Sequence, residues 1–257
     1  MIWNIIKNSW LIAYKRLLKY PINAFSWLIA DVSLYLSTFL IYFLLGTSIN
    51  YFSTYSKNEV MLYIATGFII NNIYSIFFSE AFDSFSTDIW NGKIYYNLLK
   101  PYNIHLTYIS KNINLKSVVS TPLLLLFWKW SMTNCSVNID AIAVASIMLG
   151  AISMAAIFGC MLNLDLLGIR TDSFTVIVVQ MLNIREKLDT IFPKGIGYFF
   201  TYVIPIFLSS AIPTRIILKE QKRIEIIWII LFPIICMVLN SLAIKDCLRN
   251  YDLGTEE

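Results

Sequence analysis

The chain has 257 residues, of which 58% are hydrophobic and 14% charged, and its formal net charge at pH 7 is +4. So few polar residues cannot cover a soluble globule, which excludes an ordinary soluble enzyme or a nucleic-acid-binding module. No segment between the apolar runs is long enough to fold separately, so we expect one membrane domain over residues 1–257. Because lipid offers no partner to the backbone, the expected fold is an all-α membrane protein.

Several kinds of chemistry are excluded by missing residues. His105 is the one histidine, so a paired-histidine zinc site cannot form, and we interpret it as a loop residue without a special role. The four cysteines are far apart and show no C-x-x-C spacing. The chain has neither a phosphate-binding loop nor a serine nucleophile elbow. We therefore expect no metal and no cofactor in this chain, and any ATP must be bound by another chain.

Residues 1–20 predict a helix that lies in the membrane interface. Trp3, Trp10 and Leu17 share one side of this helix, while Lys15 and Lys19 lie opposite. The segment lacks the apolar core and cleavage site of a signal peptide, so we expect it to remain attached. Pro21 then ends the helix and turns the chain into the bilayer.

Apolar runs predict six transmembrane helices. They cover 25–45, 60–78, 117–130, 141–162, 174–182 and 224–243, and several have the length needed to cross about 30 Å of hydrocarbon. The hydrophilic stretch 80–116 is expected to be cytoplasmic, like the amino terminus. Lysines and arginines in the first half support this orientation, whereas those between residues 185 and 223 conflict with it.

The segment before the last span contains two prolines within an apolar run, Pro205 and Pro213. Prolines at this spacing disturb a straight helix, so residues 192–223 predict an outer region with two short re-entrant helices. The alternative is that 196–218 crosses the membrane completely. In that case the basic patch after it would be cytoplasmic and the carboxyl-terminal tail extracellular.

Polar residues inside the predicted spans are candidates for a translocation path. Such groups are costly in lipid, and they usually face a cavity or pair with one another. The candidates are Asp31, Asn71, Asn72, Arg185, Glu186 and Asp189. Other interpretations stay open: Asp31 could reach lipid headgroups, the asparagines could join helices by hydrogen bonds, and Arg185 could pair with Asp189 one helical turn away.

The stretch after the second span is the most specific motif. It contains a helical segment, a glycine break and a proline stop, with Asp83 in the preceding turn. Ile89, Gly92, Leu98, Leu99, Lys100 and Pro101 match the pattern I-x-x-G-x-I-x-x-x-L-L-[KR]-P. In this stretch the chain resembles the permease subunits of ABC-2 type ATP-binding-cassette exporters. The resemblance implies that this region includes the coupling helix that docks on the ATPase.

A second match lies near the other end of the chain. Phe192-Pro193, Ile204-Pro205 and Ala211-Ile212-Pro213 resemble the proline pattern of the same family, in which paired short helices separate the fifth and sixth spans. The resemblance implies that Pro193, Pro205 and Pro213 belong to an outer gate. Charges from Arg185 to Asp189 depart from the pattern of a typical fifth span.

The resemblance predicts the membrane subunit of an ATP-driven exporter with an amphiphilic substrate: a peptide, a drug or a lipid. It implies two ABC ATPase subunits that bind ATP and Mg, and a second permease that is identical or paralogous. We expect a multi-pass protein of the bacterial plasma membrane in contact with lipids and not with nucleic acid. The alternative is a secondary transporter or channel, for which no inverted repeat is visible in the sequence. A membrane-embedded enzyme lacks recognisable catalytic groups.

Overall fold

The structure is a computed structural model that describes the chain except residues 1, 49–54, 95–103, 167–183, 186 and 254–257. Its described residues form helices and no strand, which confirms the all-α expectation. The elements are α1 (Ile2–Lys19), α2 (Pro21–Ser48), α3 (Lys57–Tyr74), the π-turn η1 (Ser75–Ser79), α4 (Glu80–Trp90), α6 (Ile104–Lys111), α7 (Thr121–Asn134), α8 (Ala141–Leu166), η2 (Asp189–Ile191), α10 (Lys194–Tyr198), η3 (Phe199–Val203), η4 (Ile206–Ser209), α11 (Ala211–Leu218) and α12 (Arg223–Leu253).

Four helical runs in the described part of the chain are long and apolar enough to cross a membrane. They are Pro21–Leu44, Lys57–Trp90, Ala141–Leu162 and Arg223–Lys245, and they coincide with the first, second, fourth and last predicted spans. The third predicted span corresponds to the 14-residue helix α7, about 21 Å long and shorter than the hydrocarbon layer. The fifth, 174–182, lies outside the described residues. The count of six spans therefore stays a prediction.

The second span is longer than its apolar run predicts. α3, η1 and α4 follow one another without a break as one run of 34 residues, Lys57–Trp90, about 51 Å long at 1.5 Å per residue. A capping box starts it, because the Ser56 hydroxyl accepts from the Glu59 N–H and the Glu59 carboxylate accepts from the Ser56 N–H. Glu80, where the predicted hydrophilic stretch begins, continues this helix. The break comes at Gly92, whose φ of +69° favours glycine.

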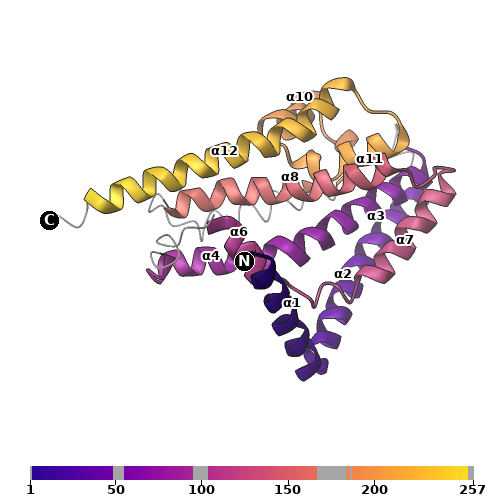
Figure 1. The fold of residues 1–257 in the computed structure, drawn as a ribbon. Coiled ribbons are helices and arrows are strands. Elements are labelled where there is room, and N and C mark those ends of the chain that lie inside the picture. The colour runs from indigo at the N-terminus through magenta and orange to yellow at the C-terminus, as the bar shows by residue number, and fades with distance from the viewer. Residues whose placement is uncertain (1, 49–54, 95–103, 167–183, 186, 254–257) are drawn as a thin grey trace.

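The bundle is organised around α8. This helix packs along α12 and α3, and α3 packs along α7 (Figure 1). Side chains of the main core include Leu62, Ile70, Met132 and Phe207, all of which are fully buried. Small residues in α8 let neighbouring helices approach closely.

α1 and α2 form a V whose point, at the turn between them, stands away from the other helices in Figure 1. Little of the apolar window of α2 is buried on this chain. α2 packs mainly on α3 and α1, and Phe39 contacts Phe127 of α7. Pro21 is the first residue of α2, so the predicted helix end at this proline is confirmed. The exposed apolar side of α2 faces lipid or another subunit.

The described segment before α12, from residue 189 to residue 218, is broken into short pieces, as the prolines predict. α10, η3, η4 and α11 gather at the end of the bundle opposite the carboxyl terminus (Figure 1). Pro205 comes directly before η4, and Pro213 lies in the first turn of α11, where a missing N–H costs little. α11 ends at Lys219 in the left-handed conformation. A straight helix over 196–218 does not form.

Candidate functional site

A polar stripe runs along the α3–α4 helix. Its members recur every four residues, as Gly67, Asn71, Ser75, Ser79 and Asp83. In a regular α-helix, steps of four residues drift around the axis, because one turn takes 3.6 residues. The π-turn η1, which covers Ser75–Ser79, holds more residues per turn and reduces this drift. The stripe therefore faces one neighbour, α2.

The central cavity lies between this stripe and α2. It has a volume of about 250 Å³. α2 contributes Trp27, Asp31 and Tyr35, and the segment before α7 contributes Asn114 and Ser117. Glu80 and Asp83 line it together with Asn71, Asn72, Ser75 and Ser79. With three carboxylates and several amide and hydroxyl groups, the cavity can bind polar or cationic groups within the membrane domain.

Asn72 and Asp31 are tied to the start of α7. The Asn72 amide donates to the Ser117 carbonyl at 2.9 Å and accepts from the Thr121 hydroxyl at 2.8 Å. The Ser120 hydroxyl donates to the Asp31 carboxylate at 3.0 Å. Through these bonds Asn72 joins α3 to the start of α7, and it also lines the central cavity. Asp31 lines the cavity wall and has a protein partner there.

Arg185 lies beside Asn71, near the Gly67 end of the polar stripe. Its guanidinium donates to the Asn71 side-chain oxygen at 2.7 Å and contacts the Met154 sulfur. Beside it, a pocket of about 20 Å³, lined also by Gly67 and Thr38, has room for roughly one water molecule. Asn71 lines both this small pocket and the central cavity. The polar space between α2 and α3 therefore narrows sharply at Arg185.

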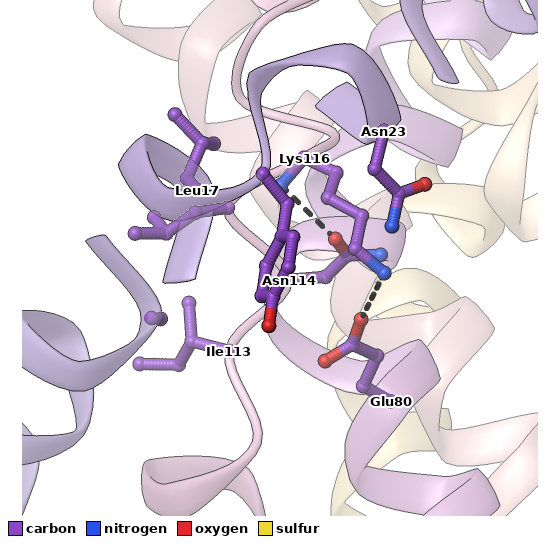
Figure 2. A pocket seen from close by; sticks show the side chains of 9 residues that line it. Leu17, Asn23, Glu80, Ile113, Asn114 and Lys116 are labelled. Carbon is purple, nitrogen blue, oxygen red and sulfur yellow. Dashed lines mark hydrogen bonds and ion pairs between the residues drawn. The ribbon is translucent and has the colours of Figure 1, made fainter. Parts of the chain in front are cut away.

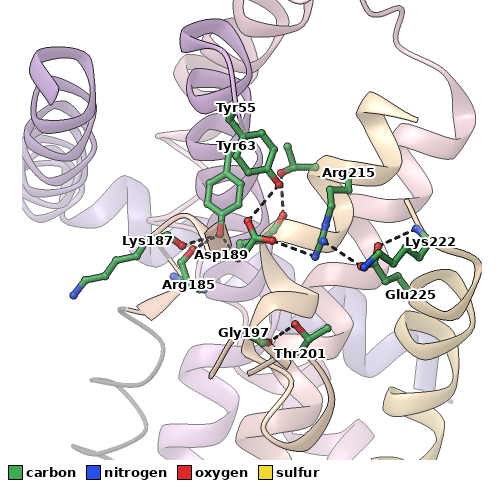
Figure 3. Close-up of polar contacts among 12 residues, drawn as sticks. Tyr55, Tyr63, Arg185, Lys187, Asp189, Gly197, Thr201, Arg215, Lys222 and Glu225 are labelled. Atoms are coloured by element: carbon green, nitrogen blue, oxygen red, sulfur yellow. Dashed lines mark hydrogen bonds and ion pairs between the residues drawn. The ribbon is translucent and has the colours of Figure 1, made fainter. Parts of the chain in front are cut away.

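Tyr63 holds the segment that carries Arg185. Its hydroxyl lies 3.0 Å from the carbonyl oxygens of both Arg185 and Lys187, and 3.1 Å from the Ser210 hydroxyl (Figure 3). Tyr63 is itself fully buried. Because two of these contacts are to backbone oxygens, Tyr63 fixes the position of the backbone at Arg185 and Lys187.

A second network links this segment to α11 and α12 (Figure 3). Arg215 lies between two carboxylates, 3.4 Å from Asp189 and 3.1 Å from Glu225. The Tyr55 hydroxyl donates to Asp189 at 3.3 Å. Burial and then the Asp189 carboxylate hold the pKa of Tyr55 above its usual value, so the phenol remains a proton donor. The network joins four separate parts of the chain.

The predicted ion pair between Arg185 and Asp189 is wrong. The two residues do not share a helix, because a turn at Arg185 precedes the short helix η2 that begins at Asp189. Asp189 pairs instead with Arg215 on α11. Glu186, between them, lies outside the described residues. The structure thus brings Asp31, Asn71, Asn72 and Arg185 to one polar space and places Asp189 in another network.

The predicted coupling region is described only in part. Ile89 packs against a second core cluster that includes Phe85, Tyr108 and Leu162. Gly92 follows α4 in a turn, and Asp83 lines the central cavity. Leu98, Leu99, Lys100 and Pro101 lie outside the described residues. The described part is an α4–α6 platform that packs on the end of α8.

The three prolines assigned to the outer gate lie in different environments. Pro193 is exposed and caps α10, whereas Pro205 and Pro213 are buried. A Cβ at Gly150 of α8 would lie only 3.0 Å from the Pro213 ring. Pro213 therefore packs directly against the bundle.

Arg215, Glu225 and Tyr63 were not among the site residues predicted from the sequence. Two features of the sequence could have indicated the first two: Arg215 lies inside an apolar run, and Glu225 lies at the start of the last span. A charged side chain at either position is costly in lipid unless it has a partner. Glu225 retains only 3% side-chain exposure in its pair with Arg215. No comparable signal marked Tyr63, because a tyrosine in a span is ordinary.

Comparison with protein families agrees with this architecture. Residues 32–253 match the family described as ABC-2 family transporter protein. No curated protein and no solved structure shows a significant match. The family match covers well over half of the chain and includes most of the residues that line the central cavity, the α3–α4 helix and the broken region before α12. The chain therefore belongs to the ABC-2 family of transporter proteins.

Proposed function

We propose that this membrane permease subunit of an ABC transporter exports an amphiphilic substrate, a peptide, drug or lipid, by alternating access. The observation that carries the proposal is the unbroken run from α3 to α4. It joins the central cavity to the segment that resembles the ATPase-coupling motif. A helix of this length extends beyond the roughly 30 Å hydrocarbon layer, so its far end is available to a soluble partner.

In this mechanism the α3–α4 helix acts as a lever. Movement of Trp90 and Gly92 on an ATPase would be transmitted along the helix, because its backbone hydrogen bonds resist bending. The movement would displace Asn71 relative to Arg185, which comes from a different segment. Opening of the narrow point at Arg185 then connects the central cavity to the outer region, with Pro193, Pro205 and Pro213 in the outer gate.

An amphiphilic substrate is supported by two adjoining spaces of opposite character. The polar central cavity borders an apolar groove of about 420 Å³ between α2, α3 and α7, lined by residues such as Leu36, Phe39 and Phe127. Tyr35 lines both spaces. A substrate can place its polar end near Asp31 and its apolar part in the groove.

The energy source in this proposal is a pair of ABC ATPase subunits that bind ATP and Mg, because this chain carries no phosphate-binding loop. A second permease, identical or paralogous, completes the path, and the assembly lies in a bacterial plasma membrane with a cytoplasmic amino terminus. Nucleotide can shift the conformational equilibrium only through its different affinity for the two states. The coupling surface must therefore keep its shape.

The experiment is co-purification of the ATPase with permease variants. Leu98→Asp together with Leu99→Asp is expected to abolish ATPase capture and transport, because charged side chains would be forced into an apolar cleft. Membrane insertion should stay normal. Lys194→Asp is the matched control, since it changes the charge of an exposed residue at the opposite end of the bundle. Normal ATPase capture by the double variant would refute the coupling assignment.

A further inference from the structure

A second pocket lies at the turn between α1 and α2 (Figure 2). This elbow pocket has a volume of about 260 Å³. Ala13, Leu17, Tyr20 and Asn23 line it from α1, α2 and the turn between them. Its opposite wall consists of Glu80 and the segment before α7, residues 113–116. It is as large as the central cavity.

The elbow pocket has an apolar side and a polar side. Figure 2 shows Leu17 and Ile113 on one side and Asn23, Lys116 and Glu80 on the other. Ala13 and Leu17 of the amphipathic helix α1 therefore line a pocket that has both apolar and polar walls. The amphipathic pattern of α1 predicts an interfacial position, which would place this pocket at the level of lipid headgroups.

One ion pair lies where the elbow pocket and the central cavity meet. Glu80 and Asn114 line both spaces. The Lys116 ammonium lies 3.6 Å from the Glu80 carboxylate. It also lies 5.3 Å from the ring of Trp27, which lines the central cavity. The Lys116 side chain thus stands at the boundary between the two spaces.

This boundary can open at little cost. The two side chains are 30% and 33% exposed, and ion pairs with such access to water contribute little stability. The Asn114 N–H donates to the Ile76 carbonyl at 2.9 Å, and the Asn72 amide donates to the Ser117 carbonyl at 2.9 Å, so the loop stays anchored to the α3–α4 helix when the ammonium moves. The Glu80–Lys116 ion pair can therefore break and re-form while the backbone stays in place, which is what a gate requires.

We propose that the elbow pocket binds a zwitterionic amphiphile from the membrane interface and that Glu80 and Lys116 form the gate to the central cavity. A ligand with both charges can separate the pair and still provide each with a partner, its anion facing Lys116 and its cation facing Glu80. An amphiphile with one charge leaves the other residue without a partner. The apolar side, with Leu17 and Ile113, takes the first part of the chain. Only the direction in which the ligand moves, from the elbow pocket to the central cavity, depends on the proposed transport function.

The test is direct binding of radiolabelled dodecylphosphocholine to the purified permease in nanodiscs of phosphatidylglycerol, with empty nanodiscs subtracted. We expect saturable binding that is at least tenfold tighter than that of dodecyltrimethylammonium, dodecyl phosphate or dodecyl maltoside. Glu80→Gln and Lys116→Gln should each lower the affinity about tenfold, the loss of one charged partner. Ala13→Trp, which fills the elbow pocket and leaves the ion pair in place, should abolish saturable binding.

The charge-swapped variant, Glu80→Lys with Lys116→Glu, separates a ligand site from a structural pair. It restores an ion pair, so thermal stability should return to the wild-type value. Affinity should stay low, because the phosphate of the ligand lies nearer its chain than the ammonium does, and the swap reverses the order of the charges. Full recovery of affinity, equal binding of the four amphiphiles, or unchanged binding by Ala13→Trp would each overturn the proposal. Because no ATPase is present, Leu98→Asp with Leu99→Asp should bind normally even if the transport proposal fails.

Discussion

Arg185 and Asn71 meet in a hydrogen bond of 2.7 Å across 114 residues of sequence. Asn71 lies on the polar stripe between the central cavity and the small pocket beside Arg185, and Arg185 closes the polar space at that point. Because one partner is on the α3–α4 helix and the other is held by Tyr63, a shift of the helix changes this contact directly. The Arg185–Asn71 hydrogen bond is thus expected to be present when the translocation path is closed and absent when it is open.

Replacement of Arg185 tests this role. Arg185→Ala should raise ATP-independent leakage of an amphiphilic dye from proteoliposomes, because it removes the group that narrows the path. Loss of a charged hydrogen bond should also lower the free energy of unfolding by about 1–3 kcal/mol. Asn71→Asp is the complementary variant, since an ion pair would hold the path closed and slow transport. Unchanged leakage in Arg185→Ala would contradict the assignment.

The network of Asp189, Arg215 and Glu225 predicts a larger effect on stability. Arg215→Gln leaves two largely buried carboxylates without their cation, which should cost about 3–5 kcal/mol in the free energy of unfolding. Thermal unfolding monitored in detergent would measure the loss. The matched control is Lys219→Asn. The exposed Lys219 lies 4.0 Å from Asp140, a pair that contributes about 0–1 kcal/mol, and asparagine tolerates its left-handed backbone.

Two glycines within helices offer a test of the packing around α11. A Cβ at Gly150 would lie 2.8 Å from the Ile70 Cδ1 and 3.0 Å from the Pro213 Cγ, whereas a Cβ at Gly67 would meet nothing within 4 Å. Gly150→Ala should therefore destabilise the protein by about 1–3 kcal/mol through overpacking. Gly67→Ala should be neutral or stabilise it by up to about 1 kcal/mol. Equal unfolding temperatures would show that α8 and α11 are not packed this closely.

Cys135, in the turn after α7, reports both topology and electrostatics. Burial and then the Glu59 carboxylate raise the pKa of its thiol to about 11. The thiolate is the reactive form, so labelling by a membrane-impermeant maleimide on intact cells should rise about tenfold per pH unit below that value. The amino-terminal orientation predicts that Cys135 is labelled while Cys247 is spared.

Glu59→Gln supplies the control for the cysteine experiment. A nearby carboxylate disfavours the thiolate, so its removal should lower the pKa of Cys135 and speed labelling at a fixed pH. Glutamine still serves in the capping box with Ser56, so α3 keeps its start. Labelling of Cys247 on intact cells would mean that the segment around Pro205 and Pro213 crosses completely.

Much of the fold followed from local signals. The start of α2 at Pro21, the break at Gly92 and the interrupted segment around Pro205 and Pro213 depend on backbone rules that act within a few residues. Hydropathy alone did not show that the helix of the second span continues to Trp90, because polar residues such as Glu80 and Asp83 lower hydropathy without ending a helix. The resemblance in the motifs was correct about the family, which the match over residues 32–253 shows.

The sequence by itself determined where apolar helices form and where proline and glycine interrupt them, since hydropathy and backbone restriction are properties of short segments. Only the tertiary structure decided which polar groups meet. Asn72 bonds to Ser117 across 45 residues, Tyr55 to Asp189 across 134, and Asp189 pairs with Arg215 in place of its near neighbour Arg185. The physical reason is that a charged side chain inside the bundle pairs with the opposite charge that helix packing places next to it. The spacing of residues in the sequence does not specify which charge that is.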